Sequence, residues 1–379
     1  MVKQLGVLCA VLALGACTKT DDSFEREVAA HKVVEARHSG ATTPTAVAPP
    51  GTLERRVLDL ASCSLEGYQI AATCPAMRAL TTELSSRGGS KELSLALGRT
   101  LLVHRSPAVR VEAAKLMGGD VASRRTIVET ARRELLPGAR QAFIEILATD
   151  GASVPAVATF LLESASHPDP QVRLQALAAL TTGAHRSVPG AADTLIALVE
   201  RDPDPTVRRT ACALGGKLGS DALIPLYEKM TARTDDAELY TACMEGVVAM
   251  FHNAPSFDTA SEAAYRLFLA RLSAQPRTEH TPPWSVMSTF CYYSHGADLD
   301  KLAAWKARAP WFDAAAVKAV ITSVIADRQA SWMARSAAVE SLVGLGASKD
   351  ELAALKLGYN PKDAGDRPLL EKIDSALGQ

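Results

Sequence analysis

The sequence has few aromatic residues, almost no net charge and no long apolar run. Aromatic residues make up 5% of the 379 positions, and 41 lysines and arginines oppose 42 aspartates and glutamates, which leaves a formal net charge of -1. A general nucleic-acid binder needs a basic surplus, so that class is excluded. No apolar stretch reaches the roughly 18 residues of a membrane-spanning helix. Because 47% of the residues are hydrophobic, the chain is nevertheless expected to fold.

Common catalytic motifs are also absent. The sequence has no Gly-x-Ser-x-Gly elbow, no Walker phosphate loop and no His-Glu-x-x-His helix. We therefore predict a non-catalytic protein that needs no cofactor or metal.

The first residues have the layout of an export signal. Lys3 precedes an apolar stretch over 5–14, and small residues follow directly before Cys17. The four residues Leu14-Gly15-Ala16-Cys17 resemble the lipobox of bacterial lipoproteins. The resemblance implies that residues 1–16 are a signal peptide, that the Cys17 thiol and new amino group are acylated, and that Thr18 directs the protein to the outer membrane. The alternative is an ordinary cleaved signal in which Cys17 occurs by chance.

Residues 17–52 form a polar, unpatterned segment that is rich in alanine, threonine and proline over 41–51. Such a composition cannot bury a core, and it predicts a flexible tether between the lipid and the folded part.

A short phrase recurs through the body of the chain. It is Ser106-Pro107-Ala108-Val109-Arg110, then Asp169-Pro170-Gln171-Val172-Arg173, then Asp204-Pro205-Thr206-Val207-Arg208, with looser copies at 136–140 and 331–335. An N-cap aspartate or serine followed by proline is typical of a helix start. Apolar residues at helical spacing follow each copy, and another apolar helical stretch precedes it. Each repeat is therefore a helix pair of about thirty residues that needs neighbours to bury its apolar face.

These repeats resemble the HEAT family of α-solenoids, in the aspartate, valine and arginine of the phrase and in the alanine three residues after the arginine. The resemblance implies an all-α fold, a right-handed α-α superhelix. It also implies a structural ladder between repeats, formed by the residues that match the family's aspartate and arginine: Asp169, Arg173, Asp204, Arg208, Arg110 and Arg140.

The repeat pattern sets the expected domain boundaries. Repeats cover 106–346 and diverge after about 236, while 53–105 forms N-terminal capping helices and 347–379 a C-terminal cap. Helical spacing predicts further helices over 261–273, 286–293, 299–308, 313–326 and 366–377.

The positions of the cysteines predict one disulfide bond. Cys63 and Cys74 flank an expected turn between two helices at 64–67, and in an oxidising compartment they would form a disulfide. Cys212 and Cys243 lie in apolar helical stretches and are expected to be buried free thiols. A weaker alternative is a zinc site made by Cys243 with His252, Cys291 and His295, whose spacings match no standard zinc module.

Aromatic residues cluster late in the chain, and all four tryptophans fall within 49 residues. The candidate partner-binding aromatics are Trp284, Tyr292, Tyr293, Trp305, Trp311 and Trp332. Aromatic residues are enriched in binding hot spots, but bulky side chains also fill irregular cores, and we favour the core.

Together these features predict a lipid-anchored HEAT-repeat protein of the cell envelope that serves as a scaffold for an unknown envelope protein. Two alternatives stay open: an enzyme or cofactor-handling protein with a pocket near 284–332, and a passive element linking outer membrane to cell wall.

Overall fold

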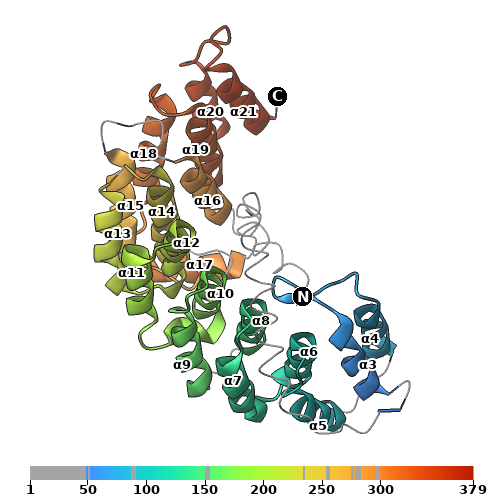
Figure 1. Cartoon of the computed structure of the whole chain (residues 1–379). Coiled ribbons are helices and arrows are strands. Elements are labelled where there is room, and N and C mark those ends of the chain that lie inside the picture. The colour runs from blue at the N-terminus through green and yellow to red at the C-terminus, as the bar shows by residue number, and fades with distance from the viewer. Residues whose placement is uncertain are drawn as a thin grey trace. The chain divides into compact units, whose positions relative to one another are not determined.

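The computed structural model describes residues 48–49, 52–86, 91–149, 154–233, 235–252, 257–274, 277, 283–294 and 299–378 (Figure 1). The chain divides into two compact units, Met1–Val188 and Pro189–Gln379. Among the described residues the only strands are β1 (Leu65–Glu66) and β2 (Gln69–Ile70), and nearly everything else is helical.

The first unit begins with a small capping segment. It consists of α3 (Leu53–Asp59), the 3-10 turn η2 (Leu60–Ser62), the β1–β2 hairpin and α4 (Pro75–Ser86). In the hairpin Leu65 pairs with Ile70 and Glu66 with Gln69. Gly67 adopts a φ of 63°, which glycine accommodates without steric cost. The chain does turn between two helices, as expected, but the turn lies at Gly67 and Tyr68 and is framed by paired strands.

Three helix pairs follow in the first unit. They are α5 (Lys91–Leu101) with α6 (Pro107–Gly118), α7 (Arg124–Arg133) with α8 (Pro137–Ala148), and α9 (Pro155–Ser164) with α10 (Pro170–Leu180). The 3-10 turns η3 (Val121–Ser123) and η4 (Gly183–Ser187) join or follow these pairs. The second helices pack on one another in chain order, α6 on α8 and α8 on α10, while α7 packs on α9. Because α5 pairs with α6, it is the first helix of a repeat and not part of the cap.

The second unit continues the same arrangement with longer connections. It contains α11 (Ala191–Arg201), α12 (Pro205–Gly215), η5 (Gly216–Leu218), η6 (Asp221–Leu223), α13 (Ile224–Thr231), α14 (Ala237–Phe251), α15 (Glu262–Ser273), α16 (Trp284–Ser294), α17 (Leu299–Arg308), α18 (Ala314–Ala326), α19 (Trp332–Gly344), α20 (Lys349–Lys356) and α21 (Arg367–Leu377). One row runs α12, α14, α16, α19 and α21, and another runs α13, α15 and α18. The helices expected in the divergent region and at the C-terminus are confirmed.

Within each unit, then, helix pairs stack side by side, which is the all-α solenoid predicted from the repeats. We call α6, α8 and α10 the second-helix row of the first unit, and α12, α14, α16 and α19 that of the second. In the described part of the chain no helix has the length and apolarity needed to cross a membrane.

Candidate binding site

The hairpin lies against the second-helix row of the first unit. Leu65 and Tyr68 pack against a buried cluster formed by Val111 on α6 and by Leu136, Ala139 and Ala142 at the start of α8. At Gly138, the second residue of α8, an added Cβ would overlap the carbonyl oxygen of Gly67. Glycine at position 138 therefore permits the hairpin turn to approach the helix closely.

A disulfide closes the base of this hairpin. Cys63, directly before the hairpin, is bonded to Cys74, directly before α4, with 5.7 Å between the Cα atoms. The pairing is the one expected from the sequence. By joining the two ends of an eleven-residue span, it holds the hairpin in place beside α4.

The hairpin, α4, α6 and α8 together enclose an open cavity of about 430 Å³. Its walls are both apolar and polar. The lining residues are Tyr68, Gln69 and Ile70 from the hairpin, Met77 from α4, Lys115 from α6, and Glu145, Ile146 and Thr149 from α8 and its end. This cavity lies in the first unit, whereas the pocket considered from the sequence was near 284–332.

Two acids and one base occupy this part of the molecule. The Glu112 side chain is almost fully buried, and its Oε2 atom lies 3.7 Å from Nζ of Lys115. Burial raises the pKa of Glu112, and the Lys115 ammonium opposes that shift. Burial likewise raises the pKa of Glu145, again opposed by Lys115. The Lys115 ammonium thus interacts electrostatically with two carboxyl groups, and it lies within ion-pair distance of Glu112.

The repeated arginines have a structural role. Arg110 donates from Nη1 to the carbonyl oxygens of His104 and Arg105 at 2.9 and 2.8 Å. Arg173 does the same to the carbonyls of His167 and Pro168. Each arginine thus ties its own helix to the turn that precedes it.

The same contact recurs in the second unit. Arg208 donates to the carbonyl of Asp202 at 2.9 Å. Arg335, in the loosest copy, donates to the carbonyl of Ile325 and pairs with Asp366.

The aspartates act differently from the ladder that the resemblance implied. Asp169 accepts hydrogen bonds from the amides of Gln171 and Val172, in the first turn of its own helix α10. Asp204 caps α12 in the same way. Their role is N-capping, which satisfies amides that have no helical partner. Arg140 lies over the Phe160 ring, 5.2 Å from its centroid, and so contacts the following repeat through a cation–π interaction.

Sequence reasoning missed a further recurring position, six residues before each arginine. His104 and His167 each accept, through Nδ1, the amide hydrogen of the N-cap residue two positions later, at 3.1 Å. Asp202 and Glu134 fill the same position with carboxylate acceptors, at 2.9 and 3.0 Å. The sequence does contain this signal, because four copies of the phrase have a side chain that can accept a hydrogen bond six residues before the arginine.

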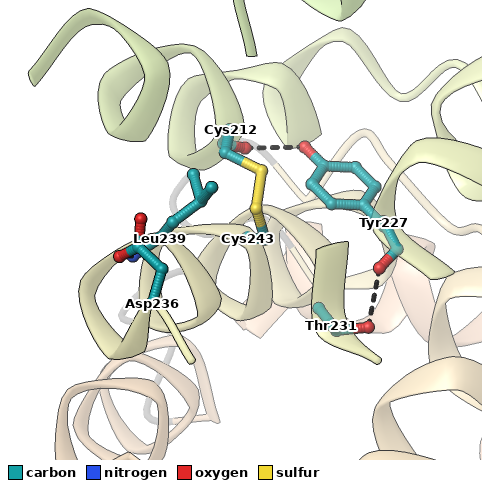
Figure 2. The surroundings of a disulfide bond; sticks show 6 residues. All are labelled: Cys212, Tyr227, Thr231, Asp236, Leu239 and Cys243. Atoms are coloured by element: carbon teal, nitrogen blue, oxygen red, sulfur yellow. Dashed lines mark hydrogen bonds between the residues drawn. A yellow bond between two sulfur atoms is a disulfide. The ribbon is translucent and has the colours of Figure 1, made fainter. Parts of the chain in front are cut away.

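A second disulfide corrects another expectation. Cys212 on α12 is bonded to Cys243 on α14, with 4.8 Å between the Cα atoms, so these are not free thiols (Figure 2). Beside the bond the Tyr227 hydroxyl donates to the carbonyl of Cys212 at 2.7 Å, and Thr231 donates to the carbonyl of Tyr227. Burial raises the pKa of the Tyr227 phenol, which therefore donates as a neutral group.

The disulfide also removes one ligand of the zinc alternative, because a bonded Cys243 offers no thiolate. His295 and the Cys291 side chain lie outside the described residues. In the described part of the chain no cluster of three histidine, cysteine or acidic residues could hold a metal ion.

The aromatic residues divide between core and surface. Trp305 is buried, and its indole nitrogen donates to the carbonyls of Phe251 and Thr259 at 2.8 and 2.9 Å. Trp311 packs at 5.2 Å from the ring of Tyr265. Trp284 and Trp332, by contrast, are 49% and 54% exposed. The side chains of Tyr292 and Tyr293 lie outside the described residues.

Comparison with known proteins supports the repeat assignment. The sequence profile of HEAT repeats matches residues 158–246, the span from α9 to α14 in which the recurring phrase is clearest. No curated protein matches the chain. The match supports a HEAT-repeat protein, a class of helical repeat scaffold that often mediates protein interactions. Cys17 and the residues of the predicted signal and tether up to 47 lie outside the described residues.

Proposed function

We propose that this chain is an exported, lipid-anchored and non-catalytic scaffold that binds a partner protein along the second-helix row of its first unit. The observation that carries the proposal is a partly exposed face of α10. The hairpin segment packs on α6 and α8, whereas Gln171 is exposed and Leu174, Gln175 and Ala178 are partly exposed. These four residues lie on one helical face, mixed apolar and polar as in a protein interface.

Two disulfides support export. Cys63–Cys74 and Cys212–Cys243 both join neighbouring elements of the fold, and such bonds persist in oxidising compartments such as the bacterial periplasm. The predicted lipobox supplies the anchor, because two or more acyl chains hold a protein on a membrane where a single chain is marginal.

Metabolic labelling with an alkynyl palmitate tests the anchor. The wild-type chain and a Cys9→Ala control, which alters the signal but keeps the lipobox, should both incorporate label and sediment with membranes. Cys17→Ala should do neither. Label retained in Cys17→Ala would contradict the anchor.

Site-specific photocrosslinking in cells tests the scaffold. A photoreactive residue at Gln171 or Gln175 on α10 should give one discrete crosslinked band, whereas Thr159, exposed on the neighbouring first helix α9, is the matched control. Equal crosslinking from both helices, or none from α10, would contradict a partner surface on the second-helix row. The band is then identified by mass spectrometry and its crosslink mapped on both proteins.

A further inference from the structure

The cavity beneath the hairpin has a feature that the scaffold role does not use. Glu145 on α8 is one of its lining residues, and in the part of the chain that the structure describes its carboxyl group makes no hydrogen bond or ion pair. The nearby Lys115 ammonium lies 3.7 Å from Oε2 of Glu112, and its charge also acts on Glu145. The cavity and the buried Glu112 beside it therefore hold two carboxyl groups and one ammonium between them.

The walls around Glu145 suit an aliphatic stem. Ile70, Met77 and Ile146 offer apolar surface, and Tyr68 adds an aromatic ring. An ammonium group on a methylene chain suits both the apolar lining and the Glu145 carboxyl group, because its methylene stem packs on apolar surface while its charged head reaches the acid. An aromatic ring nearby adds a cation–π attraction.

From this geometry we infer that the cavity formed by the hairpin, α4, α6 and α8 binds a primary ammonium group on an aliphatic chain, with Glu145 as its acceptor. For a competing anion, Lys115 is the one cationic side chain among the lining residues, it already lies 3.7 Å from Glu112, and Glu145 would repel the anion. A bound cation also lowers the cost of ionising a partly buried acid, and burial does raise the pKa of Glu145.

The hairpin keeps this site formed. The Cys63–Cys74 bond fixes the two ends of the hairpin, and the close approach of Gly67 to Gly138 fixes its tip. Tyr68, Gln69 and Ile70 are thereby held opposite α8 before a ligand arrives, which lowers the ordering cost of binding. The inference stands independently of the scaffold role.

The chemistry fits two sources, a lysine side chain of another polypeptide and a free diamine. Calorimetric titration of the full oxidised chain with Nα-acetyl-lysine methylamide and with 1,5-diaminopentane distinguishes them. Saturable binding of both indicates a free-amine site, and binding of the lysine derivative alone indicates a polypeptide. Nα-acetyl-norleucine methylamide, which has an aliphatic stem but no ammonium, should not bind.

A conservative variant assigns the acceptor. Glu145→Gln keeps the shape and should weaken binding at least tenfold, since charged hydrogen bonds contribute about 1.5–3 kcal/mol. Glu129→Gln, which removes an exposed carboxylate of α7 that does not line the cavity, should leave binding unchanged. The inference is overturned if neither amine binds, if the norleucine derivative binds equally, or if the two variants behave alike.

Discussion

The guanidinium of Arg110 on α6 lies against the carboxylate of Glu134, the C-cap residue of α7 at the start of the loop into α8. Nε and Nη2 donate to the same Oε2 atom at 3.0 and 2.6 Å, and both side chains are almost fully buried. The other oxygen of Glu134 accepts the amides of Leu135 and Leu136. One acid thus joins an arginine of the first repeat to the helix start of the second.

Removal of either partner should therefore destabilise the first unit strongly. Arg110→Ala leaves the Glu134 carboxylate buried without its cation, and we expect a loss of about 3–5 kcal/mol in the free energy of unfolding. Urea unfolding followed by circular dichroism of the full chain measures it.

A matched control is available in the same unit. Arg132 and Glu163 also join neighbouring repeats, with bonds of 2.9 and 3.0 Å, but these side chains are 40% and 45% exposed. Arg132→Ala should cost at most about 1 kcal/mol. Equal losses at the two arginines would show that burial does not set the strength of these pairs.

The position six residues before the arginine links the fold to pH. Each of His104 and His167 must be neutral at Nδ1 to accept the N-cap amide. Burial, followed by the charges of Arg105 and Arg110, lowers the pKa of His104. Burial, followed by Arg140, lowers the pKa of His167.

We therefore expect stability to fall in mild acid. Well above pH 6.5, the ordinary imidazole pKa, both histidines are neutral in the folded and in the unfolded protein. As the pH falls below 6.5, the imidazoles bind protons in the unfolded protein first, because their pKa values in the folded protein are lowered. Stability is therefore lost as the pH falls from 6.5 through the lowered pKa values of the folded protein. A His104→Asn, His167→Asn double variant keeps an acceptor that does not titrate. Unfolding curves between pH 8 and 5 should show a smaller pH dependence for the variant, while parallel curves would exclude these histidines.

The sequence predicts most helices, because their determinants are local. Asp169 and Asp204 cap helices directly before their apolar stripes, and these caps form as expected. The β1–β2 hairpin was not predicted, because strands of two residues are too short to show the alternation of apolar and polar residues. The cavity could not be foreseen either, because residues between Tyr68 and Thr149 meet there only through tertiary packing.

The Cys212–Cys243 bond had a usable signal in the repeat period. Asp204 and Asp236, the N-caps of α12 and α14, are 32 residues apart, and the two cysteines are separated by 31, so they occupy neighbouring positions on adjacent repeats. Considered singly, each cysteine looks like an ordinary small core residue.

Loss of this disulfide should loosen α12 and α14. The chain-entropy account gives about 4 kcal/mol for a loop of this length and about 1 kcal/mol less for the Cys63–Cys74 loop. Hydrogen exchange of a Cys212→Ala, Cys243→Ala variant should show lost protection in α12 and α14, whereas Cys63→Ala, Cys74→Ala should affect the hairpin and α4. Alkylation of Cys212 in the native, unreduced protein would contradict the bond.

Close packing of α12 and η5 on α14 depends on glycine. A Cβ at Gly246 would overlap the carbonyl of Cys212 and the hydroxyl of Tyr227, the pair that forms the hydrogen bond in Figure 2. Backbone and a buried ring cannot move aside as an exposed side chain can. Gly246→Ala should therefore destabilise the second unit by about 1–3 kcal/mol, despite the better helix propensity of alanine.

The contrasting substitution is Gly358→Ala in the same unit. The nearest atom to an added Cβ there is the carbonyl oxygen of Leu355 at 3.4 Å, an ordinary contact, and Gly358 is exposed. We expect a change within about 0.5 kcal/mol in urea unfolding, as for most surface substitutions. If Gly246→Ala were equally mild, α12 and α14 would have to lie further apart than the Cys212–Cys243 bond permits.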